Sequence, residues 1–264
     1  SLIRDYTKWV SMIMTAISLA ISIIPEGLPA TSTIIMALGV QRMAKKNALV
    51  KSLPAVETLG SATVVCCDKT GTLTLNKMTV THLAVGDDFL QGVTTKVEDV
   101  SKKYDRSVYQ DLLSGAALCI NAKKDPDNPG NILGDPTEGA LVYLAEKFGI
   151  DCEEYEDAHP RAFEQPFDSD RKRMSVLNRM EGELTVYTKG AVDEMLPLCT
   201  KCRTKDGVRE MTEADREQIL KVCNGMSAEA LRVLGFAVRS VSEVPEDESC
   251  DLESDLTFVG VVGM

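Results

Sequence analysis

The sequence lacks an excess of positive charge. It has 264 residues and a formal net charge of −11, with 29 Lys and Arg against 40 Asp and Glu. Proteins bind nucleic acids largely by neutralising phosphates, so a chain this acidic is not expected to bind nucleic acid. Any site for a phosphorylated ligand must therefore be a local basic patch.

A disulfide framework is also missing. The eight cysteines are scattered, and we recognise no signal peptide, so reduced cytosolic thiols are expected. Cys199 and Cys202 have the spacing of metal ligands but no second pair and no histidine partner, which favours two ordinary thiols over a zinc site. We find no repeats and no long low-complexity segment, and 44% hydrophobic residues suffice for one large core or two small ones.

One long segment lacks charge. Residues 9–39 carry a single charged side chain, Glu26. At ~1.5 Å per helical residue, this segment can cross the ~30 Å hydrocarbon core of a bilayer. Three basic residues within 42–46 follow it and place its C-terminal end in the cytosol.

Two prolines interrupt this apolar segment. Pro25 and Pro29 have no N–H, so the carbonyls of Ile21 and Pro25 lose their helical partners. Within a membrane, such carbonyls are tolerated where they line a cavity or bind an ion. Glu26 would add a carboxylate at this depth, where acids are rarely present without a function. The alternative is a kinked helix with a protonated Glu26 bonded to a neighbour.

An aspartate follows an expected buried strand. Residues 64–67 (Val-Val-Cys-Cys) predict a strand of a parallel sheet, and residues 68–74 (Asp-Lys-Thr-Gly-Thr-Leu-Thr) form the loop after it. Ligands meet open α/β sheets at this edge, so Asp68 is well placed to accept a phosphoryl group from a nucleotide. Lys69, Thr72 and loop amides could hold the phosphoryl oxygens.

The residue at position 70 distinguishes two kinds of chemistry. A phosphatase with this type of loop would need an acid there to protonate the leaving group, and Thr70 cannot do so. A phosphorylated Asp68 should therefore persist, which argues against the alternative of a soluble phosphatase. The simplest alternative for the loop is an ordinary polar turn after a strand. Mg²⁺ prefers hard oxygen ligands; the Asp68 carboxylate and the Thr70 carbonyl could supply two, with further acids from elsewhere.

These motifs resemble those of P-type cation-transporting ATPases, close to the calcium pumps of the sarcoplasmic-reticulum type. The resemblance runs from about residue 9 to 80 and resumes in patches beyond. It is carried by the Asp68 loop and by residues 25–29 (Pro-Glu-Gly-Leu-Pro), 43–47 (Met-Ala-Lys-Lys-Asn) and 53–60 (Leu-Pro-Ala-Val-Glu-Thr-Leu-Gly).

The resemblance implies ATP-driven cation transport through an aspartyl phosphate, with ATP and Mg²⁺ as cofactors. The cation would be Ca²⁺, which proline at position 29 favours, or alternatively Na⁺, H⁺, K⁺ or Mn²⁺. In the resembling pumps the ion is coordinated by residues that match Glu26 and the carbonyls of Ile21, Ser22 and Ile24. It also implies a multi-pass membrane protein, in the plasma membrane if bacterial, with cytosolic catalytic domains and further domains that complete the cycle.

Patterns and resemblance together predict an α/β and α+β multidomain chain. Residues 1–46 would be a membrane helix with an unwound centre and a cytosolic extension, and 47–76 the first part of a haloacid-dehalogenase-like phosphorylation domain. Residues 77–254 would be an inserted α+β nucleotide-binding domain, and 255–264 a strand that returns to the phosphorylation domain. Without its other domains, such a chain should bind nucleotide with little turnover; a purely regulatory nucleotide-binding module is the third interpretation.

Within the inserted domain, periodicity predicts five features. They are helices over 111–120, over 136–148 and from Thr212, a hairpin of 174–180 with 183–188, and a strand within 231–241.

Two segments could hold the base of a nucleotide. The resemblance implies that Phe167 stacks on adenine, with Lys172 and Met174 beside it. Lys189 precedes an expected helix start and provides a positive rim, while Gly190 allows close backbone approach; the resembling pumps place this lysine against adenine. The simpler alternatives are a core aromatic followed by a solvated loop, and a surface lysine.

The phosphate contacts are less well defined. Ser169 stands where many members of the resembling family have arginine, and Arg171 or Arg173 could compensate. Arg232 matches an arginine that reaches the phosphates, a role suited to its fork of donors. Its alternative is a surface arginine on a helix.

Residues 134–138 (Gly-Asp-Pro-Thr-Glu) have a local explanation. Asp135 would be the helix N-cap, Pro136 the first helical residue and Glu138 the reciprocal member of a capping box. The resemblance nonetheless implies that Asp135, Thr137 or Glu138 binds the nucleotide.

Overall fold

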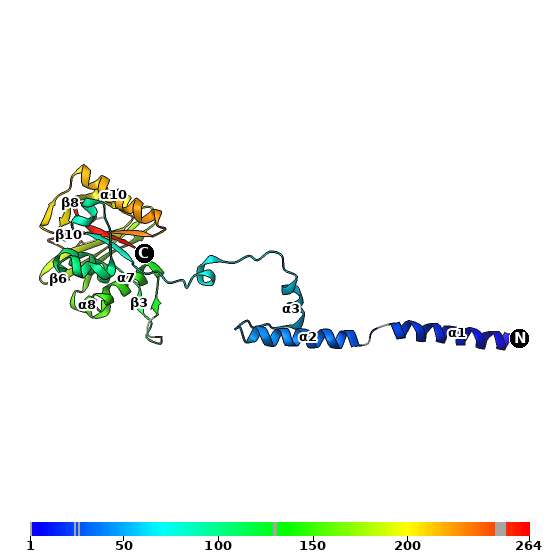
Figure 1. Ribbon diagram of the computed structural model, residues 1–264. Helices are drawn as coiled ribbons and strands as arrows, with labels where there is room; N and C mark the ends of the chain where they lie inside the picture. Colours follow the sequence, from blue (N-terminus) through cyan, green and yellow to red (C-terminus); the bar gives the residue numbers. More distant parts are fainter. Residues whose placement is uncertain (1, 24, 26, 129–130, 246–251) are drawn as a thin grey trace. The chain divides into compact units, whose positions relative to one another are not determined.

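The computed structural model describes residues 2–23, 25, 27–128, 131–245 and 252–264. It divides into two units, Ser1–Lys69 and Thr70–Met264, which are described one at a time (Figure 1).

The described part of the first unit has three helices, α1 (Leu2–Ile23), α2 (Gly27–Ala44) and α3 (Leu53–Gly60). The chain is helical on both sides of Pro25 but not at Pro25, as expected for a residue that cannot donate a helical hydrogen bond. By length and composition, the stretch Tyr6–Ala44 could cross a membrane. One detail differs from expectation: the Pro25 carbonyl accepts the Leu28 N–H at 3.0 Å, so it has a partner after all.

The predicted strand over residues 64–67 is wrong. The structure assigns no strand there, and Val64 and Val65 are 76% and 82% exposed. A central parallel strand needs hydrogen-bonded neighbours on both sides and cover on both faces. No strand in the described part of the chain pairs with these residues, so their apolar sequence has no sheet to join. The haloacid-dehalogenase-like sheet therefore remains an expectation.

In the described part of the second unit, nine strands form one sheet. Seven of them run in the order β2-β1-β11-β10-β7-β6-β5, with β8 paired to β11 and β9 paired to β8. The pairs are antiparallel except for β8 with β11, which is parallel. The strands are β1 (His82–Val85), β2 (Thr95–Lys96), β5 (Arg161–Asp168), β6 (Arg173–Met180), β7 (Glu183–Gly190), β8 (Cys199–Thr204), β9 (Gly207–Glu210), β10 (Val233–Val241) and β11 (Leu256–Gly263).

Helices cover both faces of this sheet (Figure 1). One face carries α5 (Val97–Lys103), α6 (Arg106–Leu118), α7 (Pro136–Lys147) and α8 (Cys152–Ala158); the other carries α4 (Asp87–Gln91), α9 (Val192–Met195) and α10 (Glu213–Ala228). Strand β10 shows why: Leu234 and Phe236 pack with the first set, while Ala237 packs with the second. This is the period of two that a strand imposes. Short elements complete the second unit, namely β3 (Lys123–Lys124), β4 (Ile132–Leu133) and η2 (Leu196–Leu198), and the turn η1 (Lys69–Leu73) spans the division between the units.

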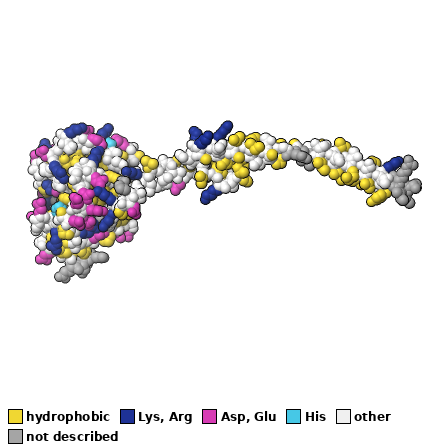
Figure 2. All heavy atoms as spheres, turned by 90° about the horizontal axis from the view of Figure 1, so that it is seen from below, with side chains coloured by type: hydrophobic (Ala, Val, Ile, Leu, Met, Phe, Trp, Pro, Cys, Tyr) yellow, Lys and Arg dark blue, Asp and Glu magenta, His cyan; other side chains and the backbone are white. Residues whose placement is uncertain are grey.

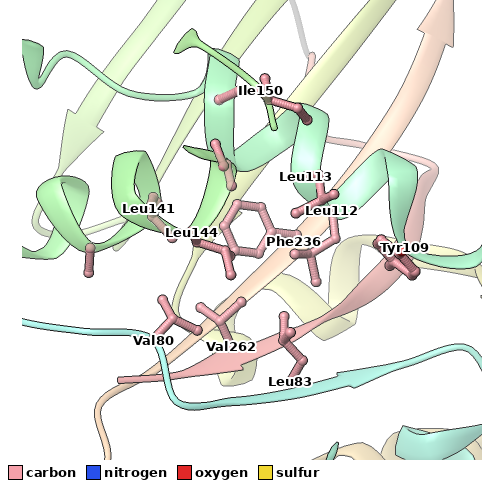
Figure 3. Packing of buried hydrophobic residues seen from close by; sticks show 14 of the residues in the cluster. Val80, Leu83, Tyr109, Leu112, Leu113, Leu141, Leu144, Ile150, Phe236 and Val262 are labelled. Carbon is pink, nitrogen blue, oxygen red and sulfur yellow. The ribbon is translucent and has the colours of Figure 1, made fainter. Parts of the chain in front are cut away.

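The larger core lies under α6 and α7. Leu112 of α6 and Leu141 and Leu144 of α7 pack with Phe236 of β10 and Val262 of β11 (Figure 3). All five side chains are buried. This packing holds α7, and with it the residues at its N-terminus, against the sheet.

The last strand corrects the predicted domain boundary. We expected residues 255–264 to leave the inserted domain, but β11 lies between β1 and β10 at the centre of this sheet. Its run of apolar residues is buried on both faces because helices cover both sides. The sequence pattern correctly indicated a buried strand, but burial alone does not identify the sheet to which a strand belongs.

Most of the predicted elements of the second unit are confirmed. Strands β6 and β7 form a hairpin around Glu181 and Gly182, both with positive φ, as a two-residue turn requires. Helix α7 starts at Pro136 and its C-cap is Phe148, while Thr212 caps α10 with a capping box. The helix expected over 111–120 is α6, which starts five residues earlier, at Arg106.

The capping box of α10 gives a test of pH dependence. Arg209 donates two hydrogen bonds to the Asp215 carboxylate, at 2.7 and 2.8 Å. These bonds are the largest influence on the pKa of Asp215, which is lowered to about 2 against the opposing effect of burial. Because folding depresses this pKa, the stabilisation is complete above about pH 4 and is lost as the pH falls towards 2.

We therefore expect Asp215→Asn to lower the free energy of unfolding by about 2 kcal/mol at pH 7 and by far less at pH 2. Urea denaturation at both pH values measures this. The exposed Asp157→Asn variant is the control. An equal loss at both pH values would show that the carboxylate charge is not what Asp215 contributes.

Candidate functional site

A cavity of about 280 Å³ in the second unit gathers residues from six separate elements or turns. It is lined by Asn121, Asp135, Thr137, Glu138, Leu141, Phe167, Met174, Lys189, Arg232 and Leu234. Seven of the nine residues that the sequence assigned to a nucleotide are in this set. They come from the start of α7, from β5, β6 and β7, and from residue 232 just before β10.

Phe167 projects from a bulge at the end of β5. The pairing of β5 with β6 shifts register between Gln165 and Asp168, so one extra residue is accommodated there. Bulges of this kind redirect a side chain, and Pro166 tolerates the position because it has no N–H to leave unpaired. The Phe167 ring lines the cavity yet is 64% exposed, so a flat ligand could stack on it.

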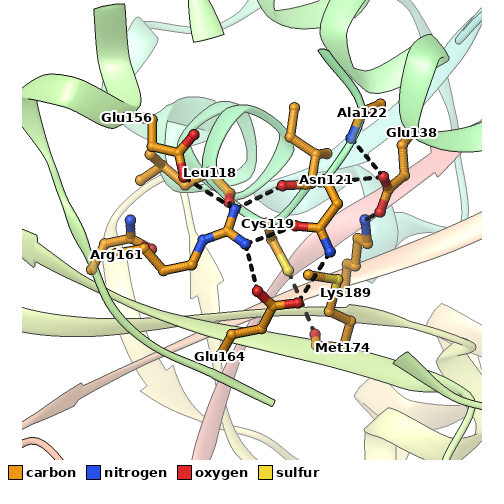
Figure 4. A network of polar contacts seen from close by, with 12 residues as sticks. Leu118, Cys119, Asn121, Ala122, Glu138, Glu156, Arg161, Glu164, Met174 and Lys189 are labelled. Carbon is orange, nitrogen blue, oxygen red and sulfur yellow. Dashed lines mark hydrogen bonds and ion pairs between the residues drawn. The ribbon is translucent and has the colours of Figure 1, made fainter. Parts of the chain in front are cut away.

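Lys189 and Glu138 form a buried ion pair in the wall of the cavity. The Lys189 Nζ lies 2.5 Å from Glu138 Oε1, and Lys189 is only 7% exposed (Figure 4). The other oxygen, Oε2, accepts the backbone N–H groups of Asn121 and Ala122, each at 2.9 Å. One carboxylate thus joins α7, the 121–122 turn and β7.

This arrangement corrects the capping box expected for α7. Asp135 is the N-cap and accepts the Thr137 N–H at 2.7 Å, as predicted. Glu138 does not bond back to the N-cap backbone; it is committed to Lys189 and to two other amides. Leaving a buried ammonium without a counter-charge costs more free energy than leaving a partly exposed helix end without a second cap.

The mouth of the cavity holds two further charges. Burial raises the pKa of Asp135, but the hydrogen bonds from Thr137 outweigh it, and the net pKa lies below the ordinary value. The nearby Arg232 guanidinium lowers the pKa further. Arg232 is exposed just before β10, and its backbone is fixed by hydrogen bonds in both directions with Met264, at 2.9 and 3.0 Å. Arg232 does not lie on a helix, so the alternative of a surface arginine on a helix is wrong.

Two predicted residues lie outside the lining. Lys172 is exposed and pairs with Glu194 at 2.9 Å. Gly190 serves the sheet: a Cβ there would lie 2.5 Å from Arg173 Cβ and 2.7 Å from the Lys172 carbonyl oxygen. The motif therefore needs glycine for close packing of β6 against β7.

Three lining residues were not predicted as part of the site. Leu141 follows Glu138 by one helical turn, so its place on the same face was accessible from the sequence. Leu234 follows Arg232 by two residues on the way into β10. Asn121 gave no signal; its side chain is held by Arg161 and Glu164, at 2.8 and 3.0 Å (Figure 4).

The Asp68 loop contains a tight turn. Thr70 and Gly71 have φ, ψ of −79°, 124° and 75°, −3°, the values of a type II turn, which needs glycine at its second central position. Asp68 and Lys69 belong to the first unit and Thr70 and Thr72 to the second, and all four are exposed. The described residues contain no group of three or more His, Cys, Asp or Glu that could hold a metal ion.

The proposed ion ligands are only partly described. Ile21 and Ser22 lie in the last turn of α1, where the Ser22 hydroxyl donates to the Leu19 carbonyl at 2.8 Å. Ile24 and Glu26 fall outside the described residues.

Cys199 and Cys202 both lie in β8, and both thiols are buried. Burial raises the pKa of the Cys199 thiol to about 12. The Cys199 thiol donates to the Met195 carbonyl at 3.4 Å. Two ordinary core thiols explain the motif.

The Glu138–Lys189 pair gives a test of how the cavity wall is held. Glu138→Ala is expected to lower the free energy of unfolding by about 3 kcal/mol, because it leaves a buried ammonium and two amides without their acceptor. Lys189→Met added to this variant should restore part of the loss. Urea denaturation measures both.

The matched control is the exposed pair of Glu98 and Lys147, joined at 2.6 Å on the surface. Glu98→Ala should change stability far less, because solvent screens the pair. Equal losses in the two pairs would contradict the role given to burial.

The chain is similar in sequence to known proteins. A family model for the P-type ATPase cytoplasmic domain N matches residues 108–264. The calcium-transporting ATPase 1 of Bacillus cereus is 45% identical over 96% of this chain and 27% of its own length. The calcium-transporting ATPases 1 of Saccharomyces cerevisiae and Lactococcus lactis are each 38% identical, over 97% and 95% of this chain and 28% and 27% of their own lengths. The chain thus spans a little more than a quarter of these relatives.

Proposed function

Because this chain belongs to the P-type ATPases, we propose that it supplies the nucleotide-binding domain, the phosphorylated loop and one membrane segment of an ATP-driven cation pump. The observation that carries this proposal is the single cavity that collects Phe167, Lys189, Glu138 and Arg232 from distant parts of the chain. We propose Ca²⁺ as the transported ion, since the relatives compared above are named as calcium transporters. Another cation is the alternative, as other similar proteins are named only as cation-transporting ATPases.

The cavity suits adenine in both shape and chemistry. Adenine has two apolar faces and a polar edge. The exposed Phe167 ring offers a stacking platform, and Met174, Leu141 and Leu234 supply further apolar surface. The Lys189–Glu138 pair would face the polar edge of the base, and at about 280 Å³ the cavity leaves the phosphates to extend outwards past Arg232.

The charges of the lining support a site that reads the base. Lys189 and Arg232 are balanced by Glu138 and Asp135, so the lining is close to neutral. Stacking and burial of the base would then supply most of the affinity, and the triphosphate would remain free to reach the phosphorylation loop.

The proposed chemistry takes place at Asp68. One carboxylate oxygen of Asp68 attacks the γ-phosphorus of ATP in line; the new O–P bond forms as the bond to the bridging oxygen breaks, and ADP leaves. Thr70 offers no acid to protonate a leaving group, so the phosphorylated aspartate would last long enough to drive a change elsewhere.

Magnesium, when bound, would neutralise phosphate charge during this transfer. The Asp68 carboxylate and the Thr70 carbonyl are hard oxygens of the kind it prefers, but they are two of the roughly six ligands that it takes. The remaining oxygens would come from phosphate, water and other parts of the complete pump.

We also propose that the interrupted segment Tyr6–Ala44 spans the membrane and contributes ion ligands. Glu26 and the carbonyls of Ile21, Ser22 and Ile24 would form part of the site. The two prolines that interrupt this segment support the proposal, because cations in transporters bind where membrane helices are broken. The nucleotide-binding and phosphorylation domains would lie in the cytosol.

The nucleotide site is tested by replacing its platform. Loss of stacking in Phe167→Leu should weaken ATP binding about tenfold, which corresponds to about 1.4 kcal/mol. Titration of the full-length protein with ATP, with Mg²⁺ chelated to prevent turnover, measures the change. Val208→Ala, a substitution of a half-exposed side chain on β9 outside the cavity, is the control. Unchanged affinity in Phe167→Leu would exclude the stacking role.

The catalytic proposal is tested at Asp68. Asp68→Asn in the full-length protein should abolish acid-stable labelling from γ-labelled ATP while ATP binding persists, because the amide is not a nucleophile. Asp157→Asn, which removes an exposed carboxylate of α8 outside the cavity, should be labelled normally. Undiminished labelling of the Asp68 variant would remove the aspartyl-phosphate mechanism.

A further inference from the structure

Glu253 is a buried acid that the proposed mechanism does not use. It is 4% exposed and lies just before β11, far in sequence from the cavity residues of β5 and β6. Its carboxylate accepts hydrogen bonds from Arg171 Nη1 at 2.6 Å, from Arg173 Nε at 2.5 Å and from the Ser175 hydroxyl at 2.8 Å. A buried carboxylate with two guanidinium partners is a strong, directional attachment point.

Both arginines lie close after Phe167 in the chain: Arg171 is in the loop and Arg173 is the first residue of β6. Arg171 uses its second terminal nitrogen, Nη2, to donate to the Pro166 carbonyl at 2.7 Å. Arg173 donates to the Arg171 carbonyl at 3.0 Å. Glu253 is therefore connected through Arg171 to the backbone of the bulge that turns the Phe167 ring outwards.

The other side of the loop is held by its own backbone. The Asp168 carboxylate accepts the N–H groups of Asp170 and Arg171, at 2.8 and 2.9 Å. The Asp168 carbonyl accepts the Lys172 N–H at 2.7 Å. These bonds are local, so they fix the form of the loop but not its position relative to the rest of the sheet.

Two long-range contacts hold Lys172, at the end of the loop: its ammonium pairs with Glu194 at 2.9 Å and its carbonyl accepts the Ala191 N–H at 3.0 Å. Glu253 supplies the long-range contact of Arg171, the residue that is bonded to the bulge.

Glu253 is itself anchored. The preceding residue, Leu252, is 2% exposed and packs with Leu177 of β6 and Val186 of β7. The acid therefore has a fixed position over the sheet, and Ser175, one of its partners, is hydrogen-bonded to Thr188 at 2.9 Å.

We propose that Glu253 is a positioning residue for the nucleotide platform: through Arg171 and Arg173 it fixes the bulge that presents the Phe167 ring to the base. This rests on the proposed function of the cavity as the ATP site. It also assigns a different role to the two arginines that could have replaced the missing arginine at Ser169. Both are bound to Glu253, so they organise the platform, and Arg232 is left as the cation at the mouth.

The test is a double-mutant cycle in the full-length protein, with ATP affinity measured while Mg²⁺ is chelated. Glu253→Gln keeps the shape of the side chain but removes the charge that holds the arginines. It should weaken ATP binding about fivefold in the otherwise unchanged protein, within the range of coupling for residues in one network. In the Phe167→Leu background it should have less than about a twofold effect, because there is no ring left to position. Glu253→Asp, which keeps the charge, should retain part of the affinity.

Asp88 provides a matched control. It is also a buried carboxylate, 1% exposed, and it accepts a lysine hydrogen bond at 2.5 Å from Lys103 together with bonds from Thr95 and Tyr104. It lines no part of the cavity. Both Asp88→Asn and Glu253→Gln should lower the melting temperature, because each weakens a buried polar network, but Asp88→Asn should leave ATP affinity unchanged.

Three results would overturn the inference. They are an unchanged affinity in Glu253→Gln, an equal loss of affinity in the Phe167→Leu background, and an equal loss of affinity in Asp88→Asn. Absence of ATP binding in the unsubstituted protein would instead contradict the proposed function of the cavity, so the two failures are distinguishable.

Discussion

The register of the antiparallel sheet is the constraint on which the candidate site depends. In the ladder, Lys189 of β7 stands opposite Met174 of β6 on one side and Phe236 of β10 on the other. A slip of one residue would turn Lys189 to the opposite face and away from Glu138. The two-residue turn at Glu181 and Gly182 sets the start of this register. Packing of Phe236 under α6 and α7 maintains it, so the core and the cavity are parts of one arrangement.

Charge pairing is the second constraint on the site. The chain is acidic overall, and around the cavity most basic side chains already have an acidic partner: Lys189 has Glu138, Lys172 has Glu194, and Arg171 and Arg173 share Glu253. Arg232 at the mouth lies close enough to Asp135 to lower its pKa. Because most of these basic side chains are already paired, the cavity suits recognition of the base better than recognition of the phosphates. The sequence led us to expect a local basic patch, but the cavity is lined by two basic and two acidic side chains. On the face of the second unit seen in Figure 2, Lys and Arg side chains likewise lie among Asp and Glu side chains.

Local structure was predictable because local signals determine it. The β6–β7 hairpin, the start of α7 at Pro136 and the start of α10 after Thr212 follow from turn and cap residues that act within a few positions. Seven of the residues that line the cavity could be predicted as one site only because the sequence resembles a known family. Three features depend on partners distant in sequence, which no local pattern specifies. They are the conformation of residues 64–67, the central position of β11 in the sheet and the ion pair of Glu138 with Lys189. Glu253 belongs to the same class: its partners are about eighty residues away.

Hydrogen–deuterium exchange of the full-length protein, with and without ATP, tests the central claim most directly. If the cavity is the nucleotide site, ATP should slow exchange in the segments that line it: the 121–122 turn, the start of α7, the Phe167 bulge and the end of β7. Exchange in α10 and in β9, which lie outside the cavity, should be unchanged. Protection confined to α10, or to the segments around the second cavity lined by His82 and Lys221, would contradict the account.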